Sequence, residues 1–193
     1  MKKKTSVLIK KKIKSFNKNI IVESDKSISH RSLLIASQCL GISNINNILE
    51  SEDVKNTIIC LKKLGVKILK KNKKYLVYGN GFGSFKKPKN NFLYAGNSGT
   101  LARMIFPLLG TQANFKVKVT GDKSLNTRDM KRVIDPLSKI GCSFYPKSKT
   151  TLPLTIEGTS MPLAQKHNET IGSAQVKSAI LLASLNTPGV TQI

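Results

Sequence analysis

The chain has 193 residues and a formal net charge of +23, with 33 Lys and Arg residues against 10 Asp and Glu residues. This length allows one ordinary domain with a buried core and excludes a second full domain. The charge suggests a protein that binds nucleic acid or anionic membranes. Only four of the basic residues are arginine, however, and the lysines fall in surface-type runs such as "KKNKK". A solvated lysine surface is therefore the favoured interpretation, with a polyanion-binding face as the alternative.

The N-terminus and the cysteines indicate the compartment. The opening "MKKKTSVLIKKKIK" begins like a signal peptide, but its apolar run "VLI" is too short for export or membrane insertion. Cys39, Cys60 and Cys142 lie far apart, without CxxC or metal-ligand spacing, so we expect reduced and partly buried thiols. Together these features predict a cytoplasmic protein that does not insert into a membrane.

The first expected elements follow a polar stretch. "SDKSISH", from Ser24 to His30, precedes the apolar helix "RSLLIAS", which begins at Arg31. A second helix is predicted from Asp53 to Gly65 by its 3.6-residue apolar period and closing glycine, and the strand "VKIL" follows it.

The same elements recur later in the chain. "GNSGT" precedes the apolar helix "RMIFPLL" from Arg103, and a helix from Asp129 to Gly141 repeats the pattern of the earlier Asp53 helix before the strand "CSFYP". "GSAQV" then precedes a third apolar helix, "KSAILLAS", from Lys177. Each apolar helix thus opens with a small-residue, polar turn.

These recurrences define a unit of about 75 residues, which reads as strand, helix, strand, helix, strand, strand. We expect repeat 1 at about 20–90, repeat 2 at about 91–162 and a partial repeat 3 at about 163–193. An α/β fold with a pseudo-threefold arrangement of units is the natural architecture. Because Ile193 falls inside the second strand of its unit, we expect the natural protein to be longer.

The three polar turns predict an anion site. In a pseudo-threefold fold the N-termini of the equivalent helices point the same way, and each presents unpaired N–H groups and partial positive charge. The candidate ligand groups are Lys26, Arg31, Asn97, Arg128, Ser173 and Gln175. Helix-capping serines and turn glycines explain each loop separately, but they explain all three together poorly.

Four ordered motifs also carry a family resemblance. "SDKSISHRSLLIAS", "LYAGNSGTLARMI", "TGDKSLNTRDMKRVIDPL" and "GSAQVKSAILLASL" resemble successive signatures of the 5-enolpyruvylshikimate-3-phosphate synthase family. The resemblance implies an enolpyruvyl transferase-like fold, an inside-out α/β barrel of two lobes, each with three βαβαββ units and the active site between them. Residues 20–193 resemble an incomplete N-terminal lobe with its third repeat truncated. Residues 1–19, with a strand near Thr5 to Ile9, would belong to the other lobe.

The resemblance implies transfer of the enolpyruvyl group of phosphoenolpyruvate to the 5-hydroxyl of shikimate 3-phosphate, as part of chorismate and aromatic amino acid biosynthesis. It further implies no cofactor, no metal and no nucleic-acid or membrane partner. The complete enzyme would be a cytoplasmic monomer and a target of glyphosate. The acid and base carboxylates would lie in the missing C-terminal lobe, so this chain alone is expected to be inactive.

The resemblance also assigns residues to the two substrates. Lys26 would be catalytic and would contact both substrates. The residues expected at shikimate 3-phosphate are Lys26, Ser27, Arg31, Ser173, Ala174 and Gln175. Those expected at phosphoenolpyruvate are Lys26, Asn97, Gly99, Arg128 and Gln175. Gly99 and Ala174 would act through backbone N–H groups, and His30 is interpreted as structural.

Three departures from the family pattern and two alternatives remain at this point. Met104 and Asp129 stand where the family usually has proline, and Ala174 stands where many members have a second serine. The sibling enzyme that transfers enolpyruvyl to UDP-N-acetylglucosamine is disfavoured because "TGDKSLNT" lacks a reactive cysteine. A basic nucleic-acid-binding module is the second alternative.

Overall fold

The computed structural model describes residues 17–169 and 172–193, together with Ser6, Leu8, Lys10, Lys12 and Ser15. The strand expected near Thr5 to Ile9 falls largely outside the described residues. The described elements are five α-helices, one short 3-10 helix and two β-sheets. None of the described helices is both long and apolar enough to cross a lipid bilayer.

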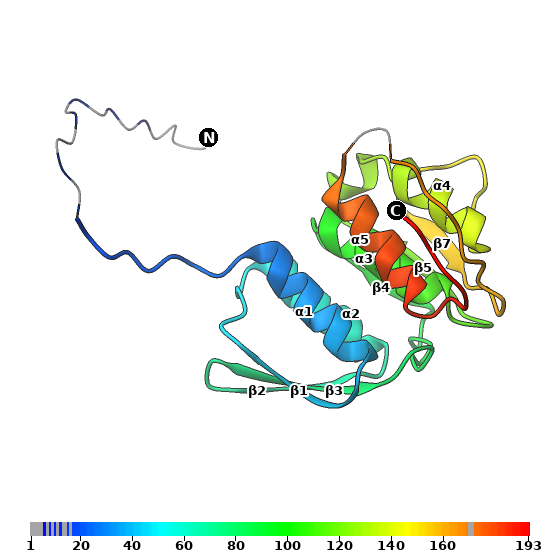
Figure 1. Cartoon of the computed structure of the whole chain (residues 1–193), viewed down its shortest axis with the longest axis horizontal. Coiled ribbons are helices and arrows are strands. Elements are labelled where there is room, and N and C mark those ends of the chain that lie inside the picture. The colour runs from blue at the N-terminus through cyan, green and yellow to red at the C-terminus, as the bar shows by residue number, and fades with distance from the viewer. Residues whose placement is uncertain are drawn as a thin grey trace.

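The first sheet has three antiparallel strands in the order β1-β3-β2. Its strands are β1 (Leu40–Asn46), β2 (Lys67–Lys71) and β3 (Lys74–Asn80). The helices α1 (Lys26–Gln38) and α2 (Glu52–Lys63) lie along one face of this sheet (Figure 1). The other face of the sheet is open, which agrees with the exposure of most β1 side chains.

The second sheet has four strands in the order β4-β5-β7-β6. Its strands are β4 (Phe92–Tyr94), β5 (Lys116–Thr120), β6 (Ser143–Tyr145) and β7 (Leu154–Glu157). Only the β4–β5 pair is parallel. The helices around this sheet are α3 (Gly99–Gly110), α4 (Lys131–Ile140) and α5 (Ala174–Ser184), and the 3-10 helix η1 (Leu125–Thr127) precedes α4.

The two sheets repeat one plan. In the first sheet, β1 follows the apolar helix α1 and pairs with β3, and β3 pairs with β2, which follows the second helix, α2. In the second sheet, β5 follows the apolar helix α3 and pairs with β7, and β7 pairs with β6, which follows the second helix, α4. Both of these second helices end at a glycine with positive φ, +88° at Gly65 and +113° at Gly141. Because L-residues rarely adopt that conformation, these glycines close α2 and α4 and release the chain into the next strand.

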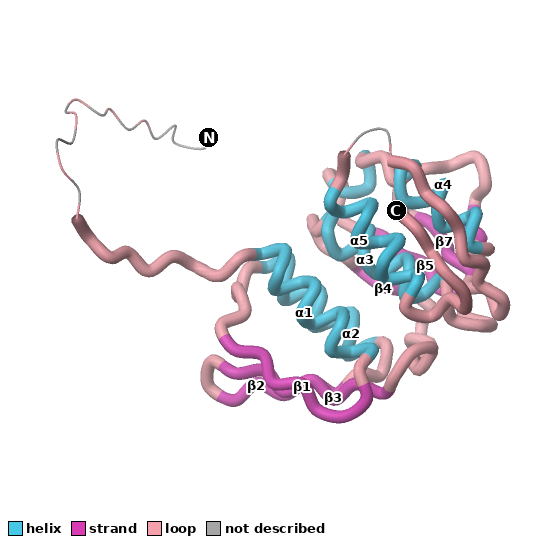
Figure 2. Tube along the Cα trace, in the orientation of Figure 1, coloured by secondary structure: helices cyan, strands magenta, loops and turns pink. Residues whose placement is uncertain are grey.

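One expected strand is absent. The prediction that the first unit opens with a strand is wrong for the described chain, because Ile20, Ile21 and Val22 precede α1 as an extended segment without strand pairing (Figure 2). Their side chains are 71%, 102% and 76% exposed. A parallel strand is stable when both of its faces are covered, and no element of the described chain covers this apolar segment. The corresponding edge of β1 is therefore unpaired, whereas β5 has β4 beside it.

The C-terminal segment contains the start of another parallel pair. Lys166 and Gln192 form an isolated parallel bridge, in which the His167 N–H donates to the Gln192 carbonyl at 2.8 Å. The helix α5 lies between these two positions in the chain. The order of a strand position, a helix and a second strand position is the same as that of β4, α3 and β5. Here, however, the two strand positions share only one bridge.

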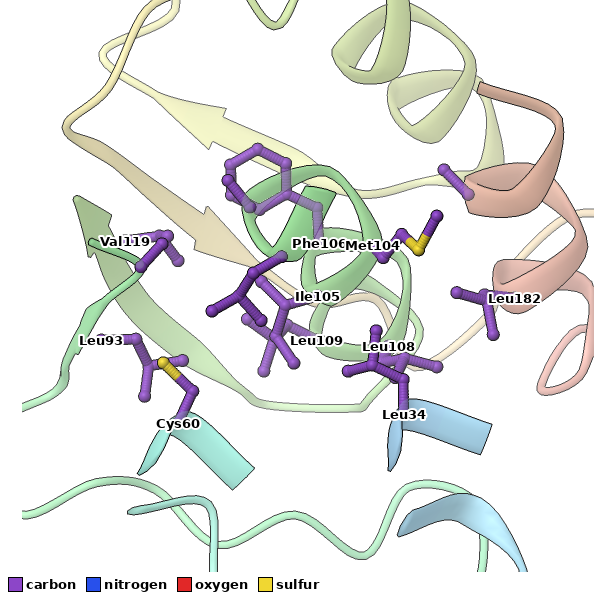
Figure 3. Close-up of a cluster of buried hydrophobic side chains, with 14 of the residues drawn as sticks. Leu34, Cys60, Leu93, Met104, Ile105, Phe106, Leu108, Leu109, Val119 and Leu182 are labelled. Atoms are coloured by element: carbon purple, nitrogen blue, oxygen red, sulfur yellow. The ribbon is translucent and has the colours of Figure 1, made fainter. Parts of the chain in front are cut away.

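The helix α3 is the centre of the core. All of its residues except Arg103 are buried, and it packs on α1, α2, α4 and α5 as well as on β5 and β7. Figure 3 shows Leu108 of α3 close to Leu34 of α1 and Met104 of α3 toward Leu182 of α5, whereas Phe106 packs edge-on against Phe144 of β6. Burial of a large apolar side chain contributes about 1.5–3 kcal/mol. The packing of α3 therefore joins the two sheets into one unit.

The three cysteines differ in environment. All are free thiols, but Cys39 is exposed, so the expected partial burial is wrong for this residue because it lies at the C-terminal end of α1. Burial raises the pKa of the Cys60 thiol to about 11 and that of Cys142 to about 12. Both buried thiols are therefore protonated and unreactive at neutral pH.

Candidate active site

The three helices that open the repeated units begin with the same cap. The side chains of Asp25, Ser98 and Ser173 accept the N–H of the residue three positions later, at 2.6, 3.1 and 3.4 Å. These caps satisfy one donor per helix and leave the other N-terminal N–H groups of each helix without a partner inside the helix. The prediction of three helices that open with polar turns is confirmed, but the polar turns are the first turns of the helices, which begin at Lys26, Gly99 and Ala174 and not at Arg31, Arg103 and Lys177.

The N-terminal ends of these helices meet at one surface pocket of about 360 Å³. The residues that line it are Lys26, Ser27, Asp53, Asn97, Gly99, Thr100, Arg103, Arg128 and Gln175. They come from α1, α2, the loop before α3, α3, the loop before α4, and α5. Three cations against one carboxylate give this pocket a net positive charge, which favours anionic ligands.

Six of the residues proposed from sequence lie together in this pocket: Lys26, Ser27, Asn97, Gly99, Arg128 and Gln175. Arg31, Ser173 and Ala174 do not line it. Arg31 lies one turn further along α1 and is partly exposed, while Ser173 caps α5 and Ala174 is the first residue of that helix. Asp53, Thr100 and Arg103 line the pocket as well, although sequence reasoning did not select them.

Lys26 is held by a carboxylate on the next helix. Its Nζ lies 2.9 Å from Oδ2 of Asp53, in the first turn of α2, and about half of the lysine side chain is exposed. An exposed pair of this kind contributes little to stability. The contact instead directs a flexible ammonium group toward the pocket, where it can exchange Asp53 for an anionic ligand.

Arg128 is held by a neutral group. Its Nη2 donates to Asn97 Oδ1 at 3.0 Å, and Asn97 Nδ2 donates to Asp122 Oδ2 at 2.7 Å. The Leu125 N–H, followed by the Asn97 amide, holds the pKa of the Asp122 carboxyl below its usual value. The ionised Asp122 therefore fixes the Asn97 amide with its oxygen toward Arg128, and the arginine is oriented without being neutralised.

Gly99 lies directly beneath the two pocket arginines. A Cβ atom added there would come within 2.9 Å of Arg103 Nη1 and 3.3 Å of Arg128 Nη1. The Gly99 N–H, expected to face phosphoenolpyruvate, donates to the Asn97 carbonyl at 3.1 Å. A ligand at this position would have to replace that contact.

Met104 and Asp129, which stand where proline is usual, each have a local structural role. Met104 is 1% exposed and fills the core beneath α3. Asp129 Oδ1 accepts the Lys131 N–H at 2.9 Å and so helps to begin α4, and the Lys131 N–H and the Thr150 hydroxyl hold its carboxyl pKa below the usual value. Neither change removes a side chain from the pocket.

The comparisons with known proteins decide the family. The family model described as EPSP synthase (3-phosphoshikimate 1-carboxyvinyltransferase) matches residues 10–193. The chain belongs to the EPSP synthase family. The 3-phosphoshikimate 1-carboxyvinyltransferase of Petrotoga mobilis is 44% identical over 181 residues, which are 93% of this chain and 41% of the relative. That of Paramagnetospirillum magneticum is 41% identical over 173 residues, 89% of this chain and 38% of the relative.

Solved structures agree with this membership. An EPSP synthase from Acinetobacter baumannii matches with a TM-score of 0.83 and 36% identity, over 89% of this chain and 39% of that chain. The resemblance and the α/β fold class expected from sequence are therefore confirmed. The chain spans about two fifths of the length of the relatives it matches. No group of three or more His, Cys, Asp and Glu side chains able to hold a metal occurs among the described residues.

His30 lies fully buried beneath the pocket and links three helices. Its Nδ1 is 2.7 Å from Thr57 Oγ1, and its Nε2 is 3.4 Å from Ser98 Oγ, the cap of α3. The Thr57 hydroxyl donates to the Asp53 carbonyl, so Nδ1 carries the proton and Nε2 accepts from Ser98. Burial lowers the His30 pKa from 6.5 to about 4, with Asp53 opposing the shift and Lys26 adding to it.

We predict that His30 makes stability fall in mild acid. The unfolded chain binds a proton near pH 6.5 and the folded chain only near pH 4, so this contribution is constant above pH 6.5 and is lost as pH falls toward 4. Between pH 7 and pH 4.5 the free energy of unfolding should drop by about 2–3 kcal/mol on account of His30. Urea melts at the two pH values measure this drop.

His30→Gln is the matched variant for that measurement. It is expected to be less stable at pH 7 but to lose correspondingly less stability between pH 7 and pH 4.5. A drop of the same size in both proteins would show that His30 is not the titrating group.

Proposed function

We propose that this chain contributes the N-terminal part of an enzyme that transfers the enolpyruvyl group of phosphoenolpyruvate to the 5-hydroxyl of shikimate 3-phosphate. The observation that carries the proposal is the meeting of three capped helix N-termini with Lys26, Arg103 and Arg128 around one pocket, in a chain of this family. Both substrates are anions, and a positive pocket with oriented amide donors suits two anions held side by side.

The proposed reaction balances as an addition followed by an elimination. The 5-hydroxyl of shikimate 3-phosphate gives up its proton to a base as its oxygen bonds to C2 of phosphoenolpyruvate, while C3 gains a proton from an acid. The C2–O bond to phosphate then breaks, phosphate leaves, and loss of a proton from C3 restores the double bond. Lys26 and Arg128 would stabilise charge on phosphoenolpyruvate, while Ser27 and Gln175 would hold shikimate 3-phosphate. The acid and base would come from the part of the relatives that this chain does not span.

Three residues that do not line the pocket are also proposed to contact shikimate 3-phosphate: Arg31, Ser173 and Ala174. Each lies on α1 or at the start of α5, next to residues that do line the pocket. We also propose a cytoplasmic location, which suits three free thiols, and a monomeric complete enzyme with no nucleic-acid partner.

The direct test is catalysis in trans. We expect the purified 193-residue chain to bind shikimate 3-phosphate weakly by calorimetry and to release no phosphate above background. Adding the C-terminal lobe of a relative such as the Petrotoga mobilis enzyme should restore phosphate release, because acid–base groups are worth about two to four orders of magnitude in rate. Turnover by the chain alone would refute the division of labour proposed here.

A second prediction separates binding from stability. Arg128→Ala should weaken phosphoenolpyruvate binding by at least tenfold with little change in melting temperature, because Arg128 is exposed and its side chain donates to the neutral amide of Asn97. Arg132 pairs with Glu169, whose side chain is only 7% exposed. Arg132→Ala should therefore cost about 2–3 kcal/mol of stability with little change in binding.

Isothermal titration with phosphoenolpyruvate and thermal melts of both variants measure this contrast. Equal losses of affinity in the two variants would mean that Arg128 is only one of many surface cations. The assignment of Arg128 to phosphoenolpyruvate would then be withdrawn.

A third prediction concerns Gly99→Ala. The added methyl group would displace the flexible ends of Arg103 and Arg128 rather than backbone, so folding should be nearly unaffected. In the enzyme reconstituted in trans, the inhibition constant of glyphosate should rise about tenfold, more than the KM of phosphoenolpyruvate, because overpacking penalises the bulkier ligand. An unchanged ratio of the two constants would exclude Gly99 from the phosphoenolpyruvate site.

A further inference from the structure

Arg103 is the pocket residue whose surroundings are least explained by folding. It is the one partly exposed residue of α3, and its guanidinium donates from Nη1 to Gln175 Oε1 at 2.9 Å and from Nη2 to the Asp129 carbonyl at 3.4 Å. Within the described part of the chain, no carboxylate forms an ion pair with it. Burial, then repulsion from Arg128 and Arg132, lowers its pKa.

A purely structural role fits these contacts poorly. A partly buried arginine costs desolvation energy, and a carboxylate partner would compensate that cost best. Here the hydrogen-bond partners are a side-chain amide and a backbone carbonyl. The Asp129 carboxylate, which forms no ion pair with Arg103, raises the Arg103 pKa less than burial and the charges of Arg128 and Arg132 lower it. The positive charge of Arg103 is therefore left for something else in the pocket.

The contact with Gln175 fixes the direction of its carboxamide. A guanidinium has only donors, so the Gln175 oxygen, and not its nitrogen, must face Arg103. Gln175 Nε2 donates one of its two hydrogens to Thr100 Oγ1 at 3.1 Å. Since Gln175 also lines the pocket, its second N–H is the group left for a ligand.

We propose that Arg103 is a positioning residue that sets the polarity of the Gln175 carboxamide, so that an N–H and not the carbonyl oxygen faces the anion in the pocket. The identity of that anion as shikimate 3-phosphate rests on the proposed function. A reversed carboxamide would direct its negative end at the ligand, which replaces an attractive contact with a repulsive one. Gly99 assists by leaving room for the guanidinium, since a Cβ there would meet Arg103 Nη1 at 2.9 Å.

The first arm of the test needs no ligand. In the ¹⁵N-labelled chain, the side-chain amide resonances of Gln175 should be shifted from those of a solvated glutamine, and Arg103→Met should move them back toward such values. Lys177→Met is the matched control, because Lys177 is an exposed cation at the aligned position of α5. It should leave the Gln175 resonances in place. Arg103→Lys, which keeps a cationic donor on one nitrogen but loses the guanidinium fork, should give an intermediate shift and serves if Arg103→Met fails to fold.

The second arm measures affinity for shikimate 3-phosphate by calorimetry. Arg103→Met should weaken binding about tenfold, or about 1.4 kcal/mol, and Lys177→Met by less than twofold. In a Gln175→Met background there is no carboxamide to position, so Arg103→Met should then change affinity by less than about threefold.

The outcomes separate the two proposals. Gln175 resonances that stay unchanged in Arg103→Met would overturn the positioning role, as would an equal tenfold loss in the Gln175→Met background, which would indicate a pure charge effect. If the wild-type chain binds neither shikimate 3-phosphate nor phosphoenolpyruvate, the proposed function fails while the first arm still decides the role of Arg103.

Discussion

The burial of α3 is the constraint on which the rest of the structure depends. Its apolar residues face α1, α2, α4, α5 and two strands, so the helix cannot shift without opening gaps on every side. The loop before α3 therefore has a fixed position relative to the loops before α1 and α5. Its two polar side chains, Thr100 and Arg103, lie toward the N-terminal end and line the pocket where those loops meet, and Arg103 is the one that is partly exposed.

The pocket keeps its positive charge because its arginines are oriented by neutral groups. Arg128 bonds to the amide of Asn97 and Arg103 bonds to the amide of Gln175. An amide oxygen can hold a guanidinium in place without cancelling its charge, whereas a carboxylate would compete with an anionic ligand. Asp122 contacts Asn97 and not Arg128 itself, and of the three pocket cations only Lys26 has a carboxylate partner within the described part of the chain.

The repeated units position the helix starts around the pocket, and the residues that differ between the units give the pocket its functional groups. The caps Asp25, Ser98 and Ser173 are equivalent and give three similar helix starts. The residues that follow differ: a lysine after the first cap, glycine after the second and alanine after the third. The shared packing brings these starts together, and the departures from symmetry decide which group faces the ligand.

The sequence by itself determined the repeated plan, the helices that open with polar turns, the glycine stops and four of the pocket residues, Lys26, Asn97, Arg128 and Gln175, because helical periodicity and turn chemistry act over a few neighbouring residues. Ser27 and Gly99 were implied only by the family resemblance. The sequence did not reveal Asp53, Thr100 or Arg103, although Arg103 aligned with Arg31 and Lys177 in the repeated helices. Only the tertiary structure decided that Arg103 turns toward Gln175, some seventy residues away, while Arg31 stays outside the pocket and Ile20–Val22 remain unpaired. The physical reason is that hydrogen-bond partners and covered faces depend on packing between distant segments, which local sequence patterns do not encode.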